Sequence, residues 1–231
     1  MLGTQPWIPR SGCGNLEKGY IMPQSTYTPS FEFESKFDGI VAGIDEVGIG
    51  SWVGPVMAAA VILRPGISDA ILKNLQDSKK LSLAKREYVY QQLINSPHVV
   101  HGMGQATLQE IEDMNIRQAT FLAMQRAVGA LTVCPDAALV DGNARPVLSC
   151  PVQMVIKGDQ RSYSIAAASI IAKVTRDSLL VEYSENFPHY GWDKNAGYGT
   201  KQHRTALEKH GISPFHRKGY APIARLLCLD K

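Results

Sequence analysis

Four acidic residues follow apolar segments of the sequence and are of a type that binds divalent cations. Asp45 and Glu46 end the apolar segment 40–44, and Asp141 follows the apolar residues that precede it. Asp159 comes shortly after a third apolar segment. In open α/β sheets the carboxyl ends of strands form the ligand crevice, so acids from distant parts of a chain can converge there. Four carboxylates in one crevice repel one another and raise each other's pKa unless cations neutralise them.

The chemistry that such a cluster supports is hydrolysis of a phosphodiester. Oxygen ligands favour a hard cation, Mg²⁺ or Mn²⁺. Two such ions about 3.5–4 Å apart can activate a water molecule and stabilise the leaving oxygen. The alternative for each acid taken alone is a helix cap or a turn residue. Asp45 and Glu46 raise a further question, because neighbours on a regular strand point to opposite faces. Both reach one site only if the chain bends, which Gly48 and Gly50 permit.

The secondary structure predicted around these acids is an alternation of strands and helices. Short apolar segments predict five strands, over residues 40–44, 56–63, 98–104, 137–140 and 152–156. Apolar periodicity and capping residues predict helices over 83–94, 116–131, 162–183 and 200–210, with a short helix after Pro222. Ser82, Thr107 and Thr200 are the expected caps, and Thr107 with Glu110 has the pattern of a capping box. This order predicts an α/β fold with a mixed sheet.

The length and composition are those of one domain with a short extension. The chain has 231 residues, of which 45% are hydrophobic and 19% charged, enough for one sizeable core. Residues 1–37 carry scattered Pro, Gly and Ser without periodicity and are predicted to be an irregular extension whose aromatic side chains leave room for packing. We expect a catalytic domain over 38–205 and a helical segment packed on it over 206–231.

Charge, hydropathy and cysteine spacing exclude several classes of protein. The net charge of +3 is compatible with nucleic-acid binding without arguing for it. The longest apolar segment, residues 53–63, is shorter than the roughly 20 residues that span a bilayer. The N-terminus has neither an apolar signal core nor the arginines of an import signal. The four cysteines form no CxxC pair, which disfavours zinc and fits a reducing compartment. We therefore expect a cytoplasmic monomer without a membrane anchor.

The glycines near residue 48 do not form a nucleotide-binding loop. Gly48 and Gly50 would need a third glycine at position 53 for a dinucleotide fingerprint, and that position is Val53. Gly43 and Gly48 have the spacing of a P-loop, but isoleucine rather than lysine follows. Glycines here are more consistent with close approach of the backbone to another group.

Several motifs, in order along the chain, resemble bacterial ribonuclease HII, a type 2 ribonuclease H. They lie at residues 43–56 (GIDEVGIGSWVGPV), 77–82, 140–143, 157–177, 197–203 and 216–218. The resemblance covers about residues 39 to 222 and implies a ribonuclease H-like fold, here a mixed five-stranded sheet flanked by helices. It also implies a divalent-metal endonuclease that cuts RNA in RNA–DNA hybrids. Such an enzyme also cuts 5′ of a single ribonucleotide in duplex DNA, leaving a 3′-hydroxyl and a 5′-phosphate.

The same resemblance assigns the four acids. Asp45, Glu46, Asp141 and Asp159 match the family's catalytic carboxylates, which hold its Mg²⁺ or Mn²⁺ ions. Asp177 competes with Asp159 for the fourth place. Asp159 is preferred, because the family's fourth acid lies in the Lys-Gly-Asp segment before the long helix.

Recognition of the 2′-hydroxyl, which distinguishes RNA from DNA, is carried in the family by a Gly-Arg-Gly turn and a tyrosine. These match Gly48-Ile49-Gly50 and Tyr198. Isoleucine in place of arginine keeps the backbone donors of the turn but lacks a guanidinium. The hypothesis is that the carboxylate chemistry is retained while junction recognition is weaker or altered. The alternatives are an impaired homologue that binds hybrid duplexes with weak cleavage, and a different metal nuclease with the same acidic site.

Basic residues predict where the phosphates of the duplex lie. Lys79 and Lys80 fall in a turn-like segment and are expected to contact the substrate. The segment 201–218 carries five Lys or Arg residues against the single acid Glu208. Contacts of this kind make binding weaken with salt. The alternative for any one lysine is a solvated surface position.

Overall fold

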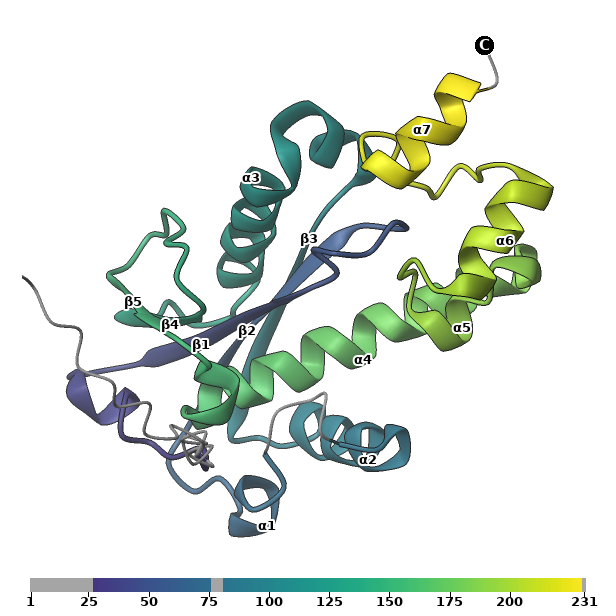
Figure 1. Ribbon diagram of the computed structural model, residues 1–231. Helices are drawn as coiled ribbons and strands as arrows, with labels where there is room; N and C mark the ends of the chain where they lie inside the picture. Colours follow the sequence, from purple (N-terminus) through teal and green to yellow (C-terminus); the bar gives the residue numbers. More distant parts are fainter. Residues whose placement is uncertain (1–26, 76–80, 230–231) are drawn as a thin grey trace, which may run out of the picture.

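The computed structural model describes residues 27–75 and 81–229, and it contains the mixed five-stranded sheet expected from the sequence (Figure 1). The strand order is β3-β2-β1-β4-β5. β1 and β2 pair antiparallel, as do β2 and β3, whereas β4 runs parallel to both β1 and β5. The strands are β1 (Val41–Val47), β2 (Val56–Leu63), β3 (Val99–Ala106), β4 (Ala137–Asp141) and β5 (Val152–Val155).

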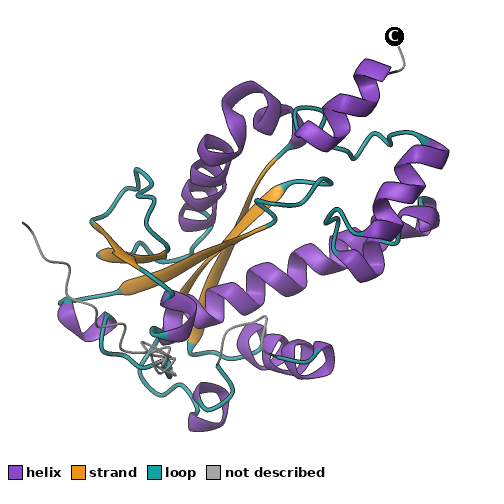
Figure 2. Ribbon diagram, in the orientation of Figure 1, coloured by secondary structure: helices purple, strands orange, loops and turns teal. Residues whose placement is uncertain are grey.

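Helices cover both faces of this sheet (Figure 2). α3 packs on one face, and α4 with α2 packs on the other. α5 and α6 lie beside the C-terminal end of α4, and α7 lies between α6 and the upper end of α3 in this view (Figure 1). The α-helices are α1 (Asp69–Leu72), α2 (Leu83–Ile94), α3 (Leu108–Gly129), α4 (Tyr163–Asn186), α5 (Trp192–Asn195), α6 (Lys201–His210) and α7 (Ala221–Leu229). Three 3-10 turns are η1 (Glu34–Lys36), η2 (Gly158–Gln160) and η3 (Pro188–Tyr190). None of the helices in the described part of the chain is long and apolar enough to cross a membrane.

Small residues let α4 lie directly on the sheet. A Cβ added to Gly43 would come within 2.2 Å of the carbonyl carbon of Ser164, so the β1 backbone and α4 are in contact at this point. Ala166, Ala167 and Ala168 of α4 are fully buried in the cluster on this face. Ile44, the next residue of β1, belongs to the opposite cluster under α3. The two faces of β1 therefore belong to different cores.

Two predicted boundaries were wrong near the acidic residues. β1 does not end before the acids but continues through Asp45 and Glu46 to Val47. α3 begins at Leu108 instead of residue 116, because it consists of two helical halves joined at a kink. The kink is Asn115, with φ 70° and ψ 161°, whose side-chain oxygen accepts hydrogen bonds from the next turn. The predicted start at residue 116 is thus the start of the second half.

The described part of the predicted N-terminal extension packs against the domain. Phe33 is buried in a small cluster with Val41 of β1. The Glu34 carboxylate accepts hydrogen bonds at 2.7 Å from the hydroxyls of both Ser162 and Ser164 at the start of α4. These contacts tie residues 30–37 to α4, whereas the predicted domain boundaries stay predictions.

Candidate active site

Asp45 and Glu46 lie on opposite faces of β1, as neighbours on a regular strand must. Asp45 is only 7% exposed and hydrogen-bonds Ser169 of α4. Glu46 lines a cavity on the α3 side, together with Thr120 and Asp141. The strand continues through both acids without a bend. The two carboxylates are nevertheless close to each other, because they are adjacent residues near the C-terminal end of β1, one on each face of the sheet.

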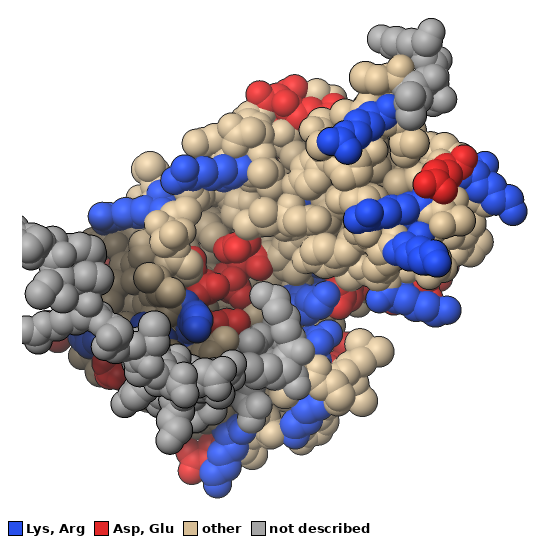
Figure 3. All heavy atoms as spheres, viewed as in Figure 1, with Lys and Arg blue, Asp and Glu red and all other residues tan. Residues whose placement is uncertain are grey.

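The electrostatics of this region identify it as an acidic cluster. The pKa of Asp45 is raised well above its ordinary value, first by burial and then by repulsion from Glu46 and Asp141. Asp141 is the last residue of β4, the parallel neighbour of β1. Figure 3 shows acidic side chains gathered near the middle of the displayed face. Strands that are neighbours in the sheet but distant in the sequence therefore supply the three carboxylates.

A short turn brings the fourth candidate acid to the same edge of the sheet. Lys157 adopts a left-handed conformation (φ 55°, ψ 43°) and leads the chain from β5 into η2. The N–H of Gly158 then donates a hydrogen bond of 2.6 Å to the Asp141 carboxylate. Asp159 follows directly and is 8% exposed.

Asp177, the competing candidate for the fourth acid, is engaged in ion pairs on α4. Its carboxylate lies 2.8 Å from the Lys173 ammonium and 3.7 Å from the Arg86 guanidinium. A carboxylate held by two cations is already neutralised, which favours a structural role over metal binding.

The donor set fits a hard divalent cation. Asp45, Glu46 and Asp141 offer carboxylate oxygens, the ligand type that Mg²⁺ and Mn²⁺ prefer. Within residues 27–75 and 81–229, no group of three or more His, Cys, Asp or Glu side chains is placed closely enough to hold a metal ion as the side chains stand. Burial and the repulsion from Glu46 and Asp141 together raise the pKa of Asp45, and a cation bound beside these carboxylates would stabilise their charged forms.

The glycine turn and Tyr198 lie side by side, as the substrate-recognition hypothesis requires. A Cβ on Gly50 would stand 3.5 Å from Cε1 of Tyr198. The N–H of Trp52 donates a hydrogen bond of 2.9 Å to the carbonyl of Gly197, which joins the two loops. Ile49 and Tyr198 are 41% and 42% exposed, so both side chains face solvent at this edge.

A buried arginine that the sequence analysis did not identify supports this turn. Arg176 of α4 is completely buried and donates hydrogen bonds to the carbonyls of Val53 (2.8 Å), Pro55 (3.2 Å) and Ala196 (3.2 Å). A Cβ on Gly48 would lie 2.3 Å from its Nε, so glycine at position 48 makes room for the guanidinium. Burial, and then the proximity of a second arginine, lowers the pKa of Arg176 to about 10.

The second arginine, Arg217, does not fit the prediction that the basic residues of segment 201–218 contact phosphates at the surface. It is completely buried and does not belong to a surface patch. Its guanidinium donates to the carbonyls of Ile49 (3.0 Å) and Gly54 (2.8 Å) and to the hydroxyl of Tyr220. Both arginines lie within motifs of the sequence, which indicates that they matter, but a motif does not reveal whether a side chain is buried. Lys79 and Lys80 lie outside the described residues.

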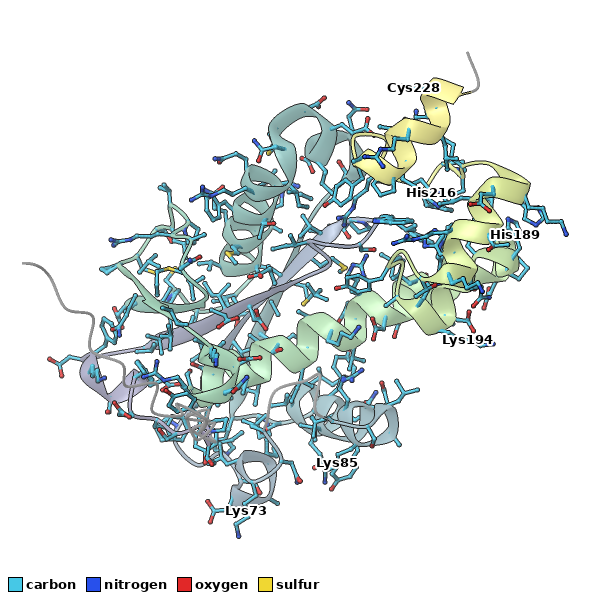
Figure 4. All side chains as sticks on the ribbon, in the orientation of Figure 1. Lys73, Lys85, His189, Lys194, His216 and Cys228 are labelled. Atoms are coloured by element: carbon cyan, nitrogen blue, oxygen red, sulfur yellow. The ribbon has the colours of Figure 1, made fainter. Side chains whose placement is uncertain are left out.

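Two buried histidines connect the C-terminal helices to Tyr198. The N–H of Ser213 donates to Nδ1 of His216 at 2.8 Å, which leaves Nε2–H of His216 to donate to Nε2 of His203 at 3.0 Å. His203 then donates from Nδ1 to the carbonyl of Tyr198 at 3.0 Å. Trp192 also donates to Nε2 of His203. Figure 4 shows His216 on the inner side of α6 and α7. Each ring uses one nitrogen as donor and one as acceptor, so both histidines are neutral in this arrangement.

This pair predicts a loss of stability in mild acid. Burial, and then repulsion from His203, lowers the pKa of His216 to about 4. Between this value and the pKa of the unfolded chain, His216 is protonated in the unfolded state but not in the folded state. The stabilisation is complete above about pH 6.5, the unfolded pKa, and is lost as the pH falls toward 4. The full loss is on the order of 3 kcal/mol. Urea unfolding between pH 7 and pH 5 should show a steeper decline for the wild type than for His216→Asn; equal slopes would contradict this assignment.

Known proteins resemble this chain over the region that contains these residues. A sequence profile described as ribonuclease HII matches residues 42–223. A ribonuclease HII from Jannaschia sp. strain CCS1 is 51% identical over 201 residues, which are 87% of this chain and 98% of that protein. The crystal structure of ribonuclease H2 from Pyrococcus horikoshii OT3 superposes with a TM-score of 0.70 at 23% identity, covering 81% of this chain and 96% of the other. That of Bst-RNase HIII in complex with Mn²⁺ gives 0.66 at 19% identity, covering 83% and 70%.

Proposed function

The chain belongs to the ribonuclease HII family, and from this premise we propose that it cleaves duplex DNA on the 5′ side of a single embedded ribonucleotide. The family's common activity is metal-dependent cleavage of RNA in RNA–DNA hybrids, and this chain is a type 2 ribonuclease H. The proposed products are a 3′-hydroxyl and a 5′-phosphate. The observation that carries the proposal is the position of the Asp45–Glu46–Asp141 cluster close to the turn that contacts Tyr198.

The proposed catalytic residues are Asp45, Glu46, Asp141 and Asp159, which would hold the divalent cations. When bound, Mg²⁺ or Mn²⁺ stabilises the charge that develops on the phosphoryl oxygens and lowers the pKa of an attacking water. The chain itself keeps Asp45 in place through Ser169 and Asp141 in place through the N–H of Gly158. These bonds fix the carboxylates before the substrate arrives, so less reorganisation accompanies catalysis.

Recognition of the ribonucleotide is proposed to come from the turn and Tyr198. The Tyr198 ring contacts the turn at Gly50, and its half-exposed side chain is available to a sugar. In the described part of the chain, the N–H of Gly50 has no hydrogen-bond partner, which leaves it available to the 2′-hydroxyl. The carbonyl of Ile49 is already occupied by Arg217 and Tyr220, so this group orients the turn instead of binding substrate.

The test uses a labelled DNA duplex with one ribonucleotide, incubated with Mg²⁺ or Mn²⁺. We expect one cut, 5′ of the ribonucleotide, and products that a polymerase extends from the new 3′-hydroxyl. An all-DNA duplex of the same sequence should remain intact. Cleavage of a long RNA–DNA hybrid without cleavage of this duplex would refute the proposed specificity while retaining the family activity.

The second candidate function, an impaired homologue that binds hybrid duplexes with weak cleavage, is favoured by one observation. Ile49 faces solvent beside the acidic cluster and carries no donor for phosphate. This second function predicts that the wild-type protein protects an RNA–DNA hybrid in a footprinting experiment but cleaves both the hybrid and the single-ribonucleotide duplex slowly. The monomeric state, the cytoplasmic location and the preferred metal stay predictions.

Ile49→Arg is expected to raise kcat/KM on the single-ribonucleotide duplex by about tenfold. A hydrogen bond from a guanidinium to phosphate contributes roughly 1.5–3 kcal/mol, and 1.4 kcal/mol corresponds to about a factor of ten. Ile49→Met, which keeps the side chain apolar, is the matched control and should cleave like the wild type. An Ile49→Arg protein no faster than Ile49→Met would show that the turn does not reach a phosphate.

A further inference from the structure

A cavity of about 290 Å³ separates the acidic cluster from the second half of α3. Glu46 and Asp141 lie on one side, with Ile49 at the turn, and Arg117 and Phe121 of α3 lie on the other. Arg117 is the one basic residue among the described residues that line this cavity. A guanidinium and two carboxylates therefore line the same opening.

The charge of Arg117 is not paired with an acid in the described part of the chain. Within residues 27–75 and 81–229, its guanidinium forms no ion pair or side-chain hydrogen bond, and Cζ of Arg117 lies 5.7 Å from the centroid of the Phe121 ring. Arg126 of the same helix behaves differently, because it pairs with Glu110 through two bonds of 2.7 and 2.8 Å. One arginine of α3 is a structural partner, and the other is exposed and available.

The kink in α3 explains how Arg117 reaches this position. Asn115 interrupts the helix, and its side-chain oxygen accepts the N–H of Arg117 at 3.0 Å. This bond makes Arg117 part of the first turn of the second half, beside Ile116 and Thr120 at the cavity. Asparagine tolerates positive φ better than most residues, so the kink is held by the residue type found there.

The charges around the cavity indicate what Arg117 binds. The backbone of a nucleic acid is anionic, and the carboxylates of Glu46 and Asp141 oppose its approach. A guanidinium presents a planar fork of donors that matches phosphate oxygens. We propose that Arg117 binds a backbone phosphate of the duplex next to the bond that is cut, an inference that rests on the proposed function.

A phosphate contact has a signature that separates it from ribose recognition. Phosphates are the same in ribonucleotide-containing and all-DNA strands, so Arg117 contributes equally to binding of both. The contact also releases bound counterions, and its removal lowers the salt dependence of binding by about one ion. Arg117 thus acts in substrate affinity, whereas Tyr198 acts in the choice of sugar.

The experiment compares Arg117→Ala with the wild type in binding and in cleavage. Fluorescence anisotropy measures the Kd of a single-ribonucleotide duplex and of the all-DNA duplex at several salt concentrations, in Ca²⁺. We expect Arg117→Ala to weaken both Kd values about tenfold, to lower the salt slope by about one, and to raise KM with kcat changed less than threefold. Arg64→Ala removes an exposed arginine at the opposite end of β2 and is the matched control.

Each outcome decides the inference. Unchanged Kd and salt slope for Arg117→Ala would overturn it, as would a loss confined to the ribonucleotide duplex. An equal loss of affinity in Arg64→Ala would show that the effect comes from the net charge of the protein, and it would also overturn the inference. The binding arm does not depend on cleavage, so a wild type that binds but does not cut would count against the proposed function alone.

Discussion

Asp141→Asn is expected to lower the rate of metal-dependent cleavage about a thousandfold and to leave the fold intact. Asparagine keeps the shape of the side chain, and its carbonyl oxygen can still accept the N–H of Gly158. The negative charge is lost, and with it a carboxylate ligand at the end of β4. Charge stabilisation by a bound metal contributes several kcal/mol, and about 4 kcal/mol corresponds to a thousandfold in rate.

The measurement is the initial rate on the single-ribonucleotide duplex, with urea unfolding of the same protein. Asp177→Asn is the matched control, because that carboxylate is paired with Lys173 and Arg86 away from the cluster. We expect its rate to fall less than tenfold. An active Asp141→Asn protein, or an inactive but folded Asp177→Asn protein, would contradict the assignment of the acids.

Arg176→Met is expected to lower the free energy of unfolding by roughly 3–5 kcal/mol and to reduce cleavage at single ribonucleotides. The three carbonyls that Arg176 binds, in Val53, Pro55 and Ala196, would lose their charged donor inside the protein. A buried polar group without a partner is costly. Because these carbonyls belong to the turn segment and the Tyr198 segment, the distance between Gly50 and Tyr198 would no longer be fixed.

Urea unfolding and cleavage assays check this prediction together. Arg176→Lys keeps a positive charge but cannot donate to three carbonyls at once, so it should lie closer to Arg176→Met than to the wild type. Cleavage of a long RNA–DNA hybrid, measured at low temperature where the variant is folded, should fall less than cleavage at a single ribonucleotide. A variant as stable as the wild type would show that these hydrogen bonds do not hold the loops.

Much of the fold follows from local patterns along the chain. Ser82, Thr107 and Thr200 were predicted as helix caps, and each accepts a backbone hydrogen bond at the start of its helix. Caps and apolar periodicity depend on residues a few positions apart, so they can be read without knowing the fold. The five strands and their mixed sheet were predicted on the same basis, and they are confirmed.

The choice of the four candidate acids followed from motif order, but their arrangement in space did not. Asp45 and Glu46 are adjacent in sequence and face different layers, which depends on where β1 ends. The strand passes the acids because Asp45 and Glu46 pair with Ala59 and Ala58 of β2. Strand pairing is a contact between distant segments, and a run of apolar residues gives no measure of its extent.

Burial of charged and polar side chains was decided by packing between distant segments. Arg217 was predicted to belong to a basic surface segment and Arg176 was given no role, yet both lie under a turn more than a hundred residues earlier in the chain. His203 and His216 form a hydrogen-bonded pair only because α6 and the segment after it fold back on each other. Residue type and spacing thus specify the helices, the strands and the candidate acids. Whether an arginine is buried or exposed depends on which carbonyls the folded chain brings within hydrogen-bond distance, because a buried charge needs such partners. Only contacts between distant segments determine this.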